Sequence, residues 1–171
     1  EAMDAGIRVG FCYITLAVVS SPIEGFTGLK VRKRMDGKEY IEASFSGPIR
    51  SAGTTASCLT IMLIDYLREL FGYDLYDPTE DEIKRVATEL DDFHERVSNL
   101  QYKPTEEEAL FLAKRMPFQL AGDASERIEV SNYKNLPRVD TNYLRSGFCL
   151  AFAEGLAQKA AKGFRLYNMA K

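Results

Sequence analysis

The sequence predicts an α+β fold in which a small antiparallel sheet packs against several helices. Apolar residues recur every three or four positions in several segments, which is typical of helices, and two short runs of strand-forming residues flank Asp36-Gly37. The chain has 171 residues, of which 46% are hydrophobic and 27% are charged. It is therefore long enough to bury a core, and we expect one domain over residues 1–171.

A first helix is expected from Ala2 to Val19, before the turn-forming segment 20–22. Because its polar face is thin, we expect this helix to be largely buried. The run GFCYITLAVV inside it is too short to cross a bilayer and lacks the flanking features of a signal peptide. The apolar residues that predict the helix are Ile7, Phe11, Ile14 and Val18.

Residues 29–45 predict a β-hairpin around Asp36-Gly37. A two-residue loop would pair Met35 with Lys38 and mix the two faces. We favour a three-residue loop that pairs Met35 with Glu39 and places Arg32 opposite Glu42. This register gathers on the core face Leu29, Val31, Ile41, Ala43 and Phe45, and on the outer face Lys30, Arg32 and Arg34. A solvated outer face is favoured over a nucleic-acid surface.

Three more helices are expected in the middle of the chain. One begins between Ser51 and Thr54, ends at Gly72 and is apolar nearly all round, which predicts a central position. The other two open with the Thr-x-x-Glu signature of a capped start, at Thr79 and Thr105. Residues 79–108 contain 10 acidic and 4 basic residues, so we expect an acidic helical hairpin at about 79–116. The apolar stripe of its first helix is Ile83, Val86, Leu90, Phe93 and Val97.

The last third of the chain predicts one or two short strands around Gly122-Asp123, with Arg127–Val130 the stronger. A loop follows, and Asp140 or Thr141 should cap a final helix. The apolar line of that helix is Leu144, Phe148, Phe152, Leu156 and Ala160, and its basic C-terminal residues are Lys159, Lys162 and Arg165.

Cysteine and histidine usage predicts no metal site in this chain. The three cysteines are Cys12, Cys58 and Cys149, each in an apolar stretch, so we expect reduced thiols in a cytoplasmic protein, with Cys58 and Cys149 in helix interfaces. His94 is the single histidine, no Cys-x-x-Cys pair occurs, and we expect His94 on the surface.

The segment SGPIRSAGTT differs from a P-loop, because five residues separate Gly47 from Gly53 and Thr54 stands where lysine is required. It still predicts a strand that turns into a helix whose free N–H groups lie beside Arg50, as in a phosphate contact. The alternative is a tight corner that serves packing alone. No nucleophile, base and oxyanion site can be assembled from this sequence, so we expect no catalytic residue in this chain.

Five blocks, from roughly Leu16 to Lys162, resemble the amino-terminal region of large subunits of the archaeal family D replicative DNA polymerases: SSPIEGF, SFSGPIRSAGTTA, LQYKPTEEE, ERIEVSNYKNLPRVDTNYLRSG and AEGLAQKA. Thr54 and Ser146 depart from the family pattern, which has glycine at both positions. The resemblance implies a KH-like domain near a catalytic core that lies downstream in double-psi β-barrels. It also implies Mg²⁺ on aspartates outside this chain, a small subunit with the proofreading exonuclease, a sliding clamp, and DNA.

Three functions follow from these observations: an architectural, DNA-proximal domain of a polymerase, a stand-alone nucleic-acid-binding module, or a protein-docking domain that uses the acidic helices. Because the chain does not begin with methionine, we expect a piece of a longer protein. We also expect no membrane segment, since its longest apolar run is too short to span a bilayer. The residues expected to contact nucleic acid are Arg50, Ser51, Gly53, Thr54, Lys134, Arg138 and Arg145.

Overall fold

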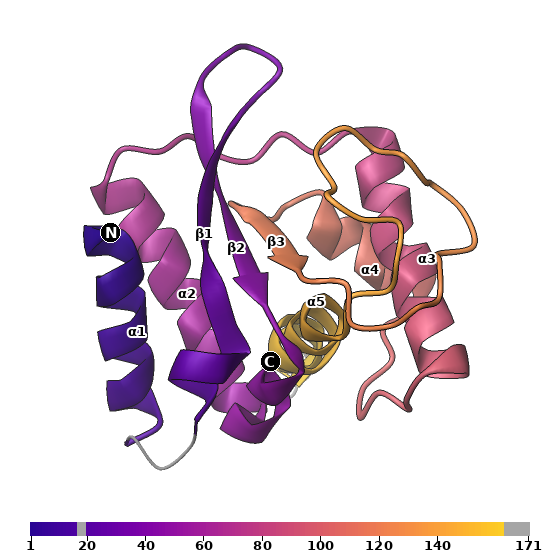
Figure 1. Cartoon of the computed structure of the whole chain (residues 1–171), viewed down its shortest axis with the longest axis horizontal. Coiled ribbons are helices and arrows are strands. Elements are labelled where there is room, and N and C mark those ends of the chain that lie inside the picture. Colours follow the sequence, from indigo (N-terminus) through magenta and orange to yellow (C-terminus); the bar gives the residue numbers. More distant parts are fainter. Residues whose placement is uncertain (17–19, 163–171) are drawn as a thin grey trace, which may run out of the picture.

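A three-stranded mixed sheet organises the chain, and helices pack against it (Figure 1). The computed structural model describes residues 1–16 and 20–162. In chain order the main elements are α1 (Ala2–Ile14), β1 (Phe26–Lys33), β2 (Glu39–Phe45), α2 (Gly53–Leu70), α3 (Glu80–Arg96), α4 (Glu106–Ala113), β3 (Gln119–Gly122) and α5 (Ser146–Leu150). Three shorter helical segments are Ser21–Gly25, Gly47–Ala52 and Ala151–Ala157, of which the last continues α5 as a π-helix. The predicted α+β class is confirmed. The KH-like topology stays a prediction.

The sheet has the order β1-β2-β3, with β1 antiparallel and β3 parallel to β2. The expectation of a purely antiparallel sheet is therefore wrong for β3. The segment Arg127–Val130, expected to be the stronger strand, forms only an isolated bridge between Glu129 and Tyr143. The other expected strand, next to Gly122-Asp123, is confirmed as β3; it is buried on both faces and so lacks the alternation that marks a strand in a sequence, which is why it was ranked the weaker of the two.

The hairpin has the predicted faces but a different register. Val31 lies opposite Ile41, Lys30 opposite Glu42, and the Arg34 N–H bonds to the Lys38 carbonyl. The loop is therefore Met35–Gly37, one residue earlier than expected. Its last residue, Gly37, has φ of 85°, the left-handed conformation that closes a three-residue hairpin loop. In the expected register Lys38 would be the last loop residue, and a residue with a side chain adopts this conformation at a cost.

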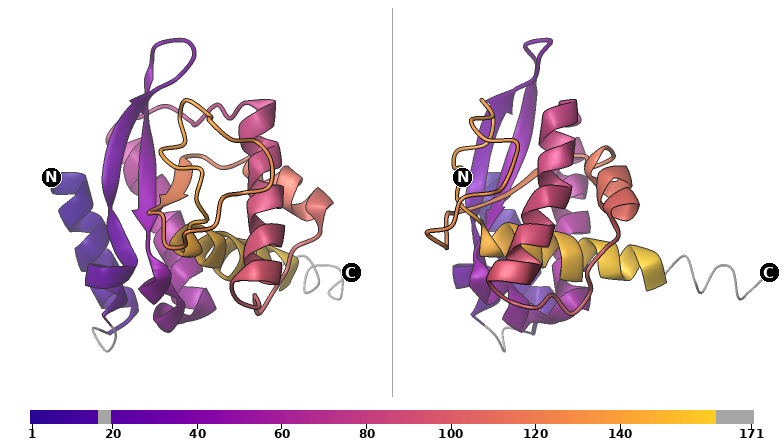
Figure 2. Two further views of the ribbon diagram at one scale, coloured as in Figure 1. Left: turned by 45° about the vertical axis from the view of Figure 1, so that its right-hand side comes forward. Right: turned by 90° about the vertical axis from the view of Figure 1, so that its right-hand side faces the viewer.

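Both faces of β2 are buried, which the alternation pattern did not predict. Ile41 and Phe45 face the hydrophobic core, while Tyr40 and Glu42 are buried on the opposite face. That face is covered by the long segment 123–145, which spans the region between the sheet and α3 (Figure 2). Val31 was expected in the core but is 52% exposed, because it lies on the edge strand near the hairpin tip.

Helix α1 ends at Ile14, not at Val19 as expected; Val18 lies outside the described residues. The Thr15 hydroxyl donates to the Phe11 carbonyl, and Leu16 turns into the left-handed region with φ of 52°, which terminates the helix. The expectation that α1 is largely buried is also wrong, since Tyr13 is exposed.

The most buried helix is α5 with its π-helical continuation, and not α2 as expected. Helix α5 begins at Ser146 and not at Asp140 or Thr141, because Tyr143 forms a bridge to Glu129 and the Leu144 N–H bonds to the Ile128 carbonyl, which keeps residues 140–145 out of the helix. Gly147 allows this helix to start directly against β2: a Cβ there would lie 2.0 Å from the Phe45 carbonyl oxygen.

Both predicted capping boxes are confirmed, at Thr79 with Glu82 and at Thr105 with Glu108. None of the three cysteines is in a disulfide. Cys149 is buried between α5 and α3, 3.7 Å from the Glu89 carbonyl, and Cys58 is half-buried in α2. Within residues 1–16 and 20–162, no helix has both the length and the hydropathy that a bilayer crossing requires.

Candidate functional site

The candidate site consists of arginines and carboxylates on the inner side of the segment 123–145. This segment has little regular structure, so its backbone cannot hold it in place through a ladder of hydrogen bonds. A few backbone hydrogen bonds join its two halves, Val130 and Leu144 are buried, and ion pairs connect it to α3 and to the outer face of the sheet. Two of the arginines predicted to contact nucleic acid, Arg138 and Arg145, belong to these ion pairs.

Glu89 on α3 is fully buried and binds two arginines. Arg145 Nε and Nη2 donate to its two carboxylate oxygens at 3.0 and 2.7 Å, and the Arg145 backbone N–H adds a third bond at 3.0 Å. Arg85, one helical turn before Glu89, donates from Nε at 3.3 Å. Its remaining donors reach the carbonyl oxygens of Tyr133 and Thr141 in the long segment.

The environment shifts the pKa values of these arginines in opposite directions. Burial lowers the pKa of Arg85. The Glu89 charge raises it, but the positive charge of Arg145 acts against this, so the pKa stays below its ordinary value. Burial acts in the same direction on Arg145, but the charge and hydrogen bonds of Glu89 outweigh it and raise the pKa. Burial also raises the pKa of the neighbouring Cys149 thiol well above its ordinary value, so this thiol is neutral at physiological pH.

Arg138 is the centre of a second cluster, next to the first. Its guanidinium group makes a two-point contact with Glu82, at 2.9 and 2.6 Å, and binds Asp77 at 2.5 Å. It lies 5.2 Å from the centre of the Tyr76 ring, which stacks on Tyr40. Glu82 also accepts the Thr79 N–H of the capping box, so one carboxylate starts helix α3 and anchors the long segment.

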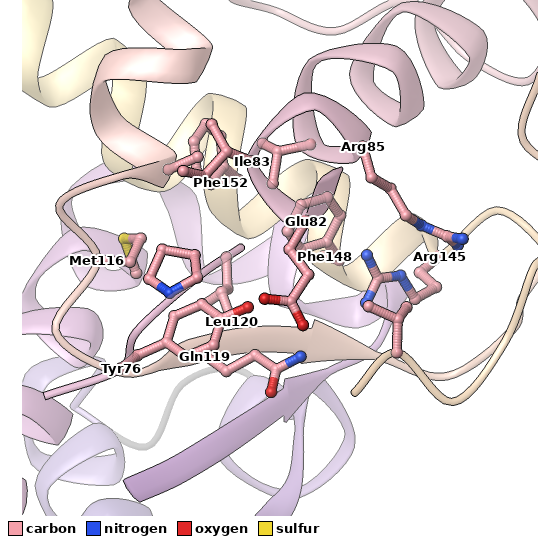
Figure 3. Close-up of a pocket in the computed structure, with 14 residues that line it drawn as sticks. Tyr76, Glu82, Ile83, Arg85, Met116, Gln119, Leu120, Arg145, Phe148 and Phe152 are labelled. Carbon is pink, nitrogen blue, oxygen red and sulfur yellow. The ribbon is translucent and has the colours of Figure 1, made fainter. Parts of the chain in front are cut away.

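Glutamine and tyrosine side chains connect this cluster to the sheet. The Tyr40 hydroxyl donates to Gln119 Oε1 at 2.8 Å, and Gln119 Nε2 donates to the Arg138 carbonyl at 2.7 Å. Burial raises the pKa of Tyr40 to about 12. Figure 3 shows Glu82, Gln119 and Tyr76 grouped beside Arg85 and Arg145 around a cavity of about 30 Å³. This cavity has room for a water molecule and none for a nucleotide.

A third cluster fastens the long segment to the hairpin. Asp140 accepts bonds from Lys30 at 2.5 Å and from Arg32 at 2.6 Å, and Arg32 also binds Glu42 at 2.5 Å. The expected ion pair between Arg32 and Glu42 is thus confirmed, although the two residues lie diagonally. The bonds from Arg32 and Lys30 lower the pKa of Asp140. Between the strands and the segment lies a polar cleft of about 240 Å³, lined in part by Arg138 and Arg145.

Arg50 lies apart from these clusters, in the 3-10 helix before α2. It donates to Glu154 at 2.9 Å and to the Asn99 carbonyl at 3.1 Å, and Glu154 also accepts the Gln101 N–H. The strand-to-helix corner was expected, and Gly53, with φ of 79°, occupies it. The sequence left open a phosphate contact and a tight packing corner, and within this chain Arg50 pairs with the carboxylate of Glu154.

The structure does not bring the seven predicted contact residues together. Arg138 and Arg145 line the polar cleft, whereas Arg50, Gly53 and Thr54 line a small cavity near Glu154. Ser51 donates to the Pro48 carbonyl, and Lys134 forms an ion pair with Glu129 on the outside of the long segment. Contact with nucleic acid stays a prediction for all seven.

Sequence reasoning missed Arg85 and Glu89, which the structure places at the centre of the site. The signal was weak: on the helix surface Glu89 borders the stripe of Ile83, Val86, Leu90 and Phe93, and Arg85 lies outside it, where a charged residue is expected to face water. His94, expected on the surface, is half-buried and accepts the Leu100 N–H at 3.0 Å.

Comparison with known proteins identifies the family. The sequence profile described as DNA polymerase II large subunit DP2, N-terminal, matches residues 1–170. The chain belongs to this family. The DNA polymerase II large subunit of Nanoarchaeum equitans is 48% identical over 162 residues, which cover 95% of this chain and 13% of that protein. The large subunit of Methanosarcina barkeri is 44% identical over 95% of this chain and 14% of its own length, and that of Picrophilus torridus 39% identical over 99% and 16%. This member of the DNA polymerase II large-subunit family therefore spans a small fraction of the length of its relatives.

Proposed function

We propose that this chain is a non-catalytic, architectural domain of a replicative DNA-directed DNA polymerase large subunit, placed close to DNA. The family membership supports the polymerase context. The observation that carries the architectural role is the pairing of the buried carboxylates: Glu42, Glu82, Glu89 and Glu154 each bind an arginine of this chain.

This pairing bears directly on chemistry. Phosphoryl transfer in polymerases uses carboxylates to hold two metal ions at the reacting phosphate. In the described part of this chain, the buried carboxylates of Glu82 and Glu89 are already neutralised by guanidinium groups, with bonds of 2.6 to 3.3 Å. These residues do not fit a Mg²⁺ site. We place the Mg²⁺ of the whole polymerase outside this chain.

The same pairing argues against a stand-alone nucleic-acid-binding module. Affinity for a phosphate backbone comes from lysines and arginines that neutralise phosphates and thereby release the counterions condensed on the nucleic acid. Arg138 and Arg145 are bound to buried carboxylates, and the net charge of the chain is −3. We therefore propose that the domain lies close to DNA within the polymerase and does not bind DNA by itself. The partners that fit this role are the rest of the large subunit, the small exonuclease subunit, the sliding clamp and DNA, in the cytoplasm.

The test compares the 171-residue chain with the complete two-subunit polymerase. The chain alone should neither extend a primer nor degrade DNA in the presence of Mg²⁺, and its DNA binding should be weak with a shallow salt dependence. The complete polymerase, in the same buffer, is the positive control. Primer extension by the chain alone would refute the proposal, and tight binding with a steep salt slope would favour the stand-alone module.

A second arm places a substitution inside the complete polymerase. Glu89→Gln should reduce the yield of assembled enzyme and leave the nucleotide-addition rate of each assembled molecule unchanged. Glu95→Gln, at an exposed position of the same helix, is the matched control and should change neither quantity. A lower rate per assembled enzyme with a normal yield would give this domain a part in catalysis and contradict the proposal.

A further inference from the structure

Helices α1 and α2 present an exposed face that is almost entirely apolar. On α1, Val9 and Tyr13 are exposed one turn apart, and Tyr13 is 82% exposed. On α2, the exposed residues Leu59, Met62 and Tyr66 follow one stripe, and Met62 is 61% exposed. The complete set, called here the apolar face, is Val9, Tyr13, Leu59, Met62, Tyr66 and Leu70.

The two stripes lie on one surface, because the helices pack against each other along a close seam. A Cβ on Gly10 would lie 2.4 Å from the Leu63 side chain, and one on Gly6 would lie 3.6 Å from Leu67. Contact therefore passes from Gly10 with Leu63 to Gly6 with Leu67, and the helices run antiparallel. Figure 1 shows them side by side at the edge of the molecule, away from α3 and α4.

Charge distinguishes this face from the other exposed helix surface. The exposed residues of α1 are Ala2, Ala5, Gly6, Val9 and Tyr13, and none is charged. On α2, the charged side chains that reach solvent are Glu69 and Asp65, and Asp65 is paired with Arg68 at 2.8 Å. On α3 every exposed residue is charged: Glu80, Asp81, Lys84, Asp91, Glu95 and Arg96. The α3 surface is thus suited to water, whereas the apolar face loses free energy when it remains in water.

We propose that the apolar face is the surface through which this domain packs onto the rest of its own large subunit, against an uncharged, apolar surface of that polypeptide. The relatives argue for this occupant, since the matched region is only 13% to 16% of their length. A covalently linked partner has a high effective concentration, so it covers such a face before a separate protein can. The apolar face contains no lysine or arginine, and the phosphate backbone of DNA requires cations.

The inference rests on the proposed function only in naming the large subunit as the occupant, and it moves the docking surface away from the acidic helices.

Hydroxyl-radical footprinting of the 171-residue chain and of the complete large subunit tests it. The oxidation of Tyr13, Met62 and Tyr66 should fall several-fold in the complete subunit. Met35, which is 79% exposed at the hairpin tip, is the internal control and should be oxidised equally in both.

Equal oxidation of Met62 in both proteins, or equal protection of Met35 and Met62, would overturn the inference. A dimer of the isolated chain with Met62 protected would assign the face to a second copy and would also overturn it. A variant pair adds a causal test: Met62→Glu should restore oxidation of Tyr13 in the complete subunit, whereas Lys84→Glu on α3 should not. A failed proposed function would appear as polymerase activity of the chain alone, which footprinting does not measure.

Discussion

At the scale of single residues, the molecule depends on charges that are buried and paired. Arg85, Glu89 and Arg145 lie in the interior, where an unpaired charge is costly. Such pairs add little net stability when complete, but the loss of one partner leaves the other charge without compensation. Substitutions at these positions should therefore have large and asymmetric effects.

Glu89→Gln should lower the free energy of unfolding by about 3–5 kcal/mol, because it leaves Arg85 and Arg145 buried without a counter-charge. Urea denaturation of the 171-residue chain measures the change. Glu95→Gln provides the comparison: the Glu95 side chain is 69% exposed and lies 4.0 Å from Lys103, so its loss should cost about 0–1 kcal/mol. Similar effects of the two substitutions would contradict the role given to Glu89.

Arg50 and Glu154 should be energetically coupled. In a double-mutant cycle with Arg50→Ala and Glu154→Gln, the coupling free energy should be about 0.5–3 kcal/mol, because their side chains meet at 2.9 Å and Glu154 is buried. If Arg50 serves this pair alone, the DNA affinity of the complete polymerase should be the same with Arg50→Ala as without it. A coupling near zero, together with weaker DNA binding and a smaller salt slope, would instead identify Arg50 as a phosphate contact.

At the scale of elements, the segment 123–145 is the part of the fold that depends most on side chains. Asp140 connects it to Lys30 and Arg32 of the hairpin, and Arg138 connects it to Asp77 and Glu82. Because these contacts are ionic, acid should loosen the segment before it disrupts the apolar core.

The pKa of Asp140 is lowered by its bonds with Arg32 and Lys30. The stabilisation is therefore complete above the unfolded-state pKa of about 3.9, and it is lost as the pH falls through the lower folded-state pKa. We expect the unfolding free energy to fall with acid below about pH 4. Asp140→Asn should flatten this decrease and lower stability at neutral pH. The same pH profile for Asp140→Asn and for the parent chain would exclude Asp140 as the source.

At the scale of the whole molecule, stability should be uneven. Helix α5 and its π-helical continuation are buried on nearly all sides and contact β2, β3, α2 and α3. Helix α1 buries only Met3, Ile7 and Phe11 and leaves its outer face apolar and exposed. The molecule thus has a rigid centre at α5 and a more weakly held layer at α1.

Hydrogen exchange of the 171-residue chain should show this gradient. Amides of α5 and β2 should exchange only through global unfolding, whereas amides of α1 should exchange through local opening at a lower free energy. In the complete large subunit, the protection of α1 should increase if the apolar face is covered there. Equal protection of α1 and α5 in the isolated chain would contradict the layered stability described here.

Features that depend on local chemistry could be predicted from the sequence alone. The capping boxes at Thr79 and Thr105, the end of α2 at Gly72, and the faces of the hairpin follow from interactions between residues close in the chain. The ion pair of Arg32 with Glu42 was also predictable, because the alternation of strand residues places both on one face.

Tertiary structure decided what depends on partners distant in sequence. Strand β3 pairs in parallel with the edge of β2 that β1 leaves free, and Glu89 binds Arg145 because the segment 123–145 folds over α3. The same folding paired Leu144 with Ile128 through the backbone and moved the start of α5 to Ser146. Helix α2 is apolar nearly all round and was expected at the centre, but it leaves one apolar face exposed. Hydrophobicity indicates that such a face is to be covered, and it does not indicate whether this domain or a neighbouring one covers it.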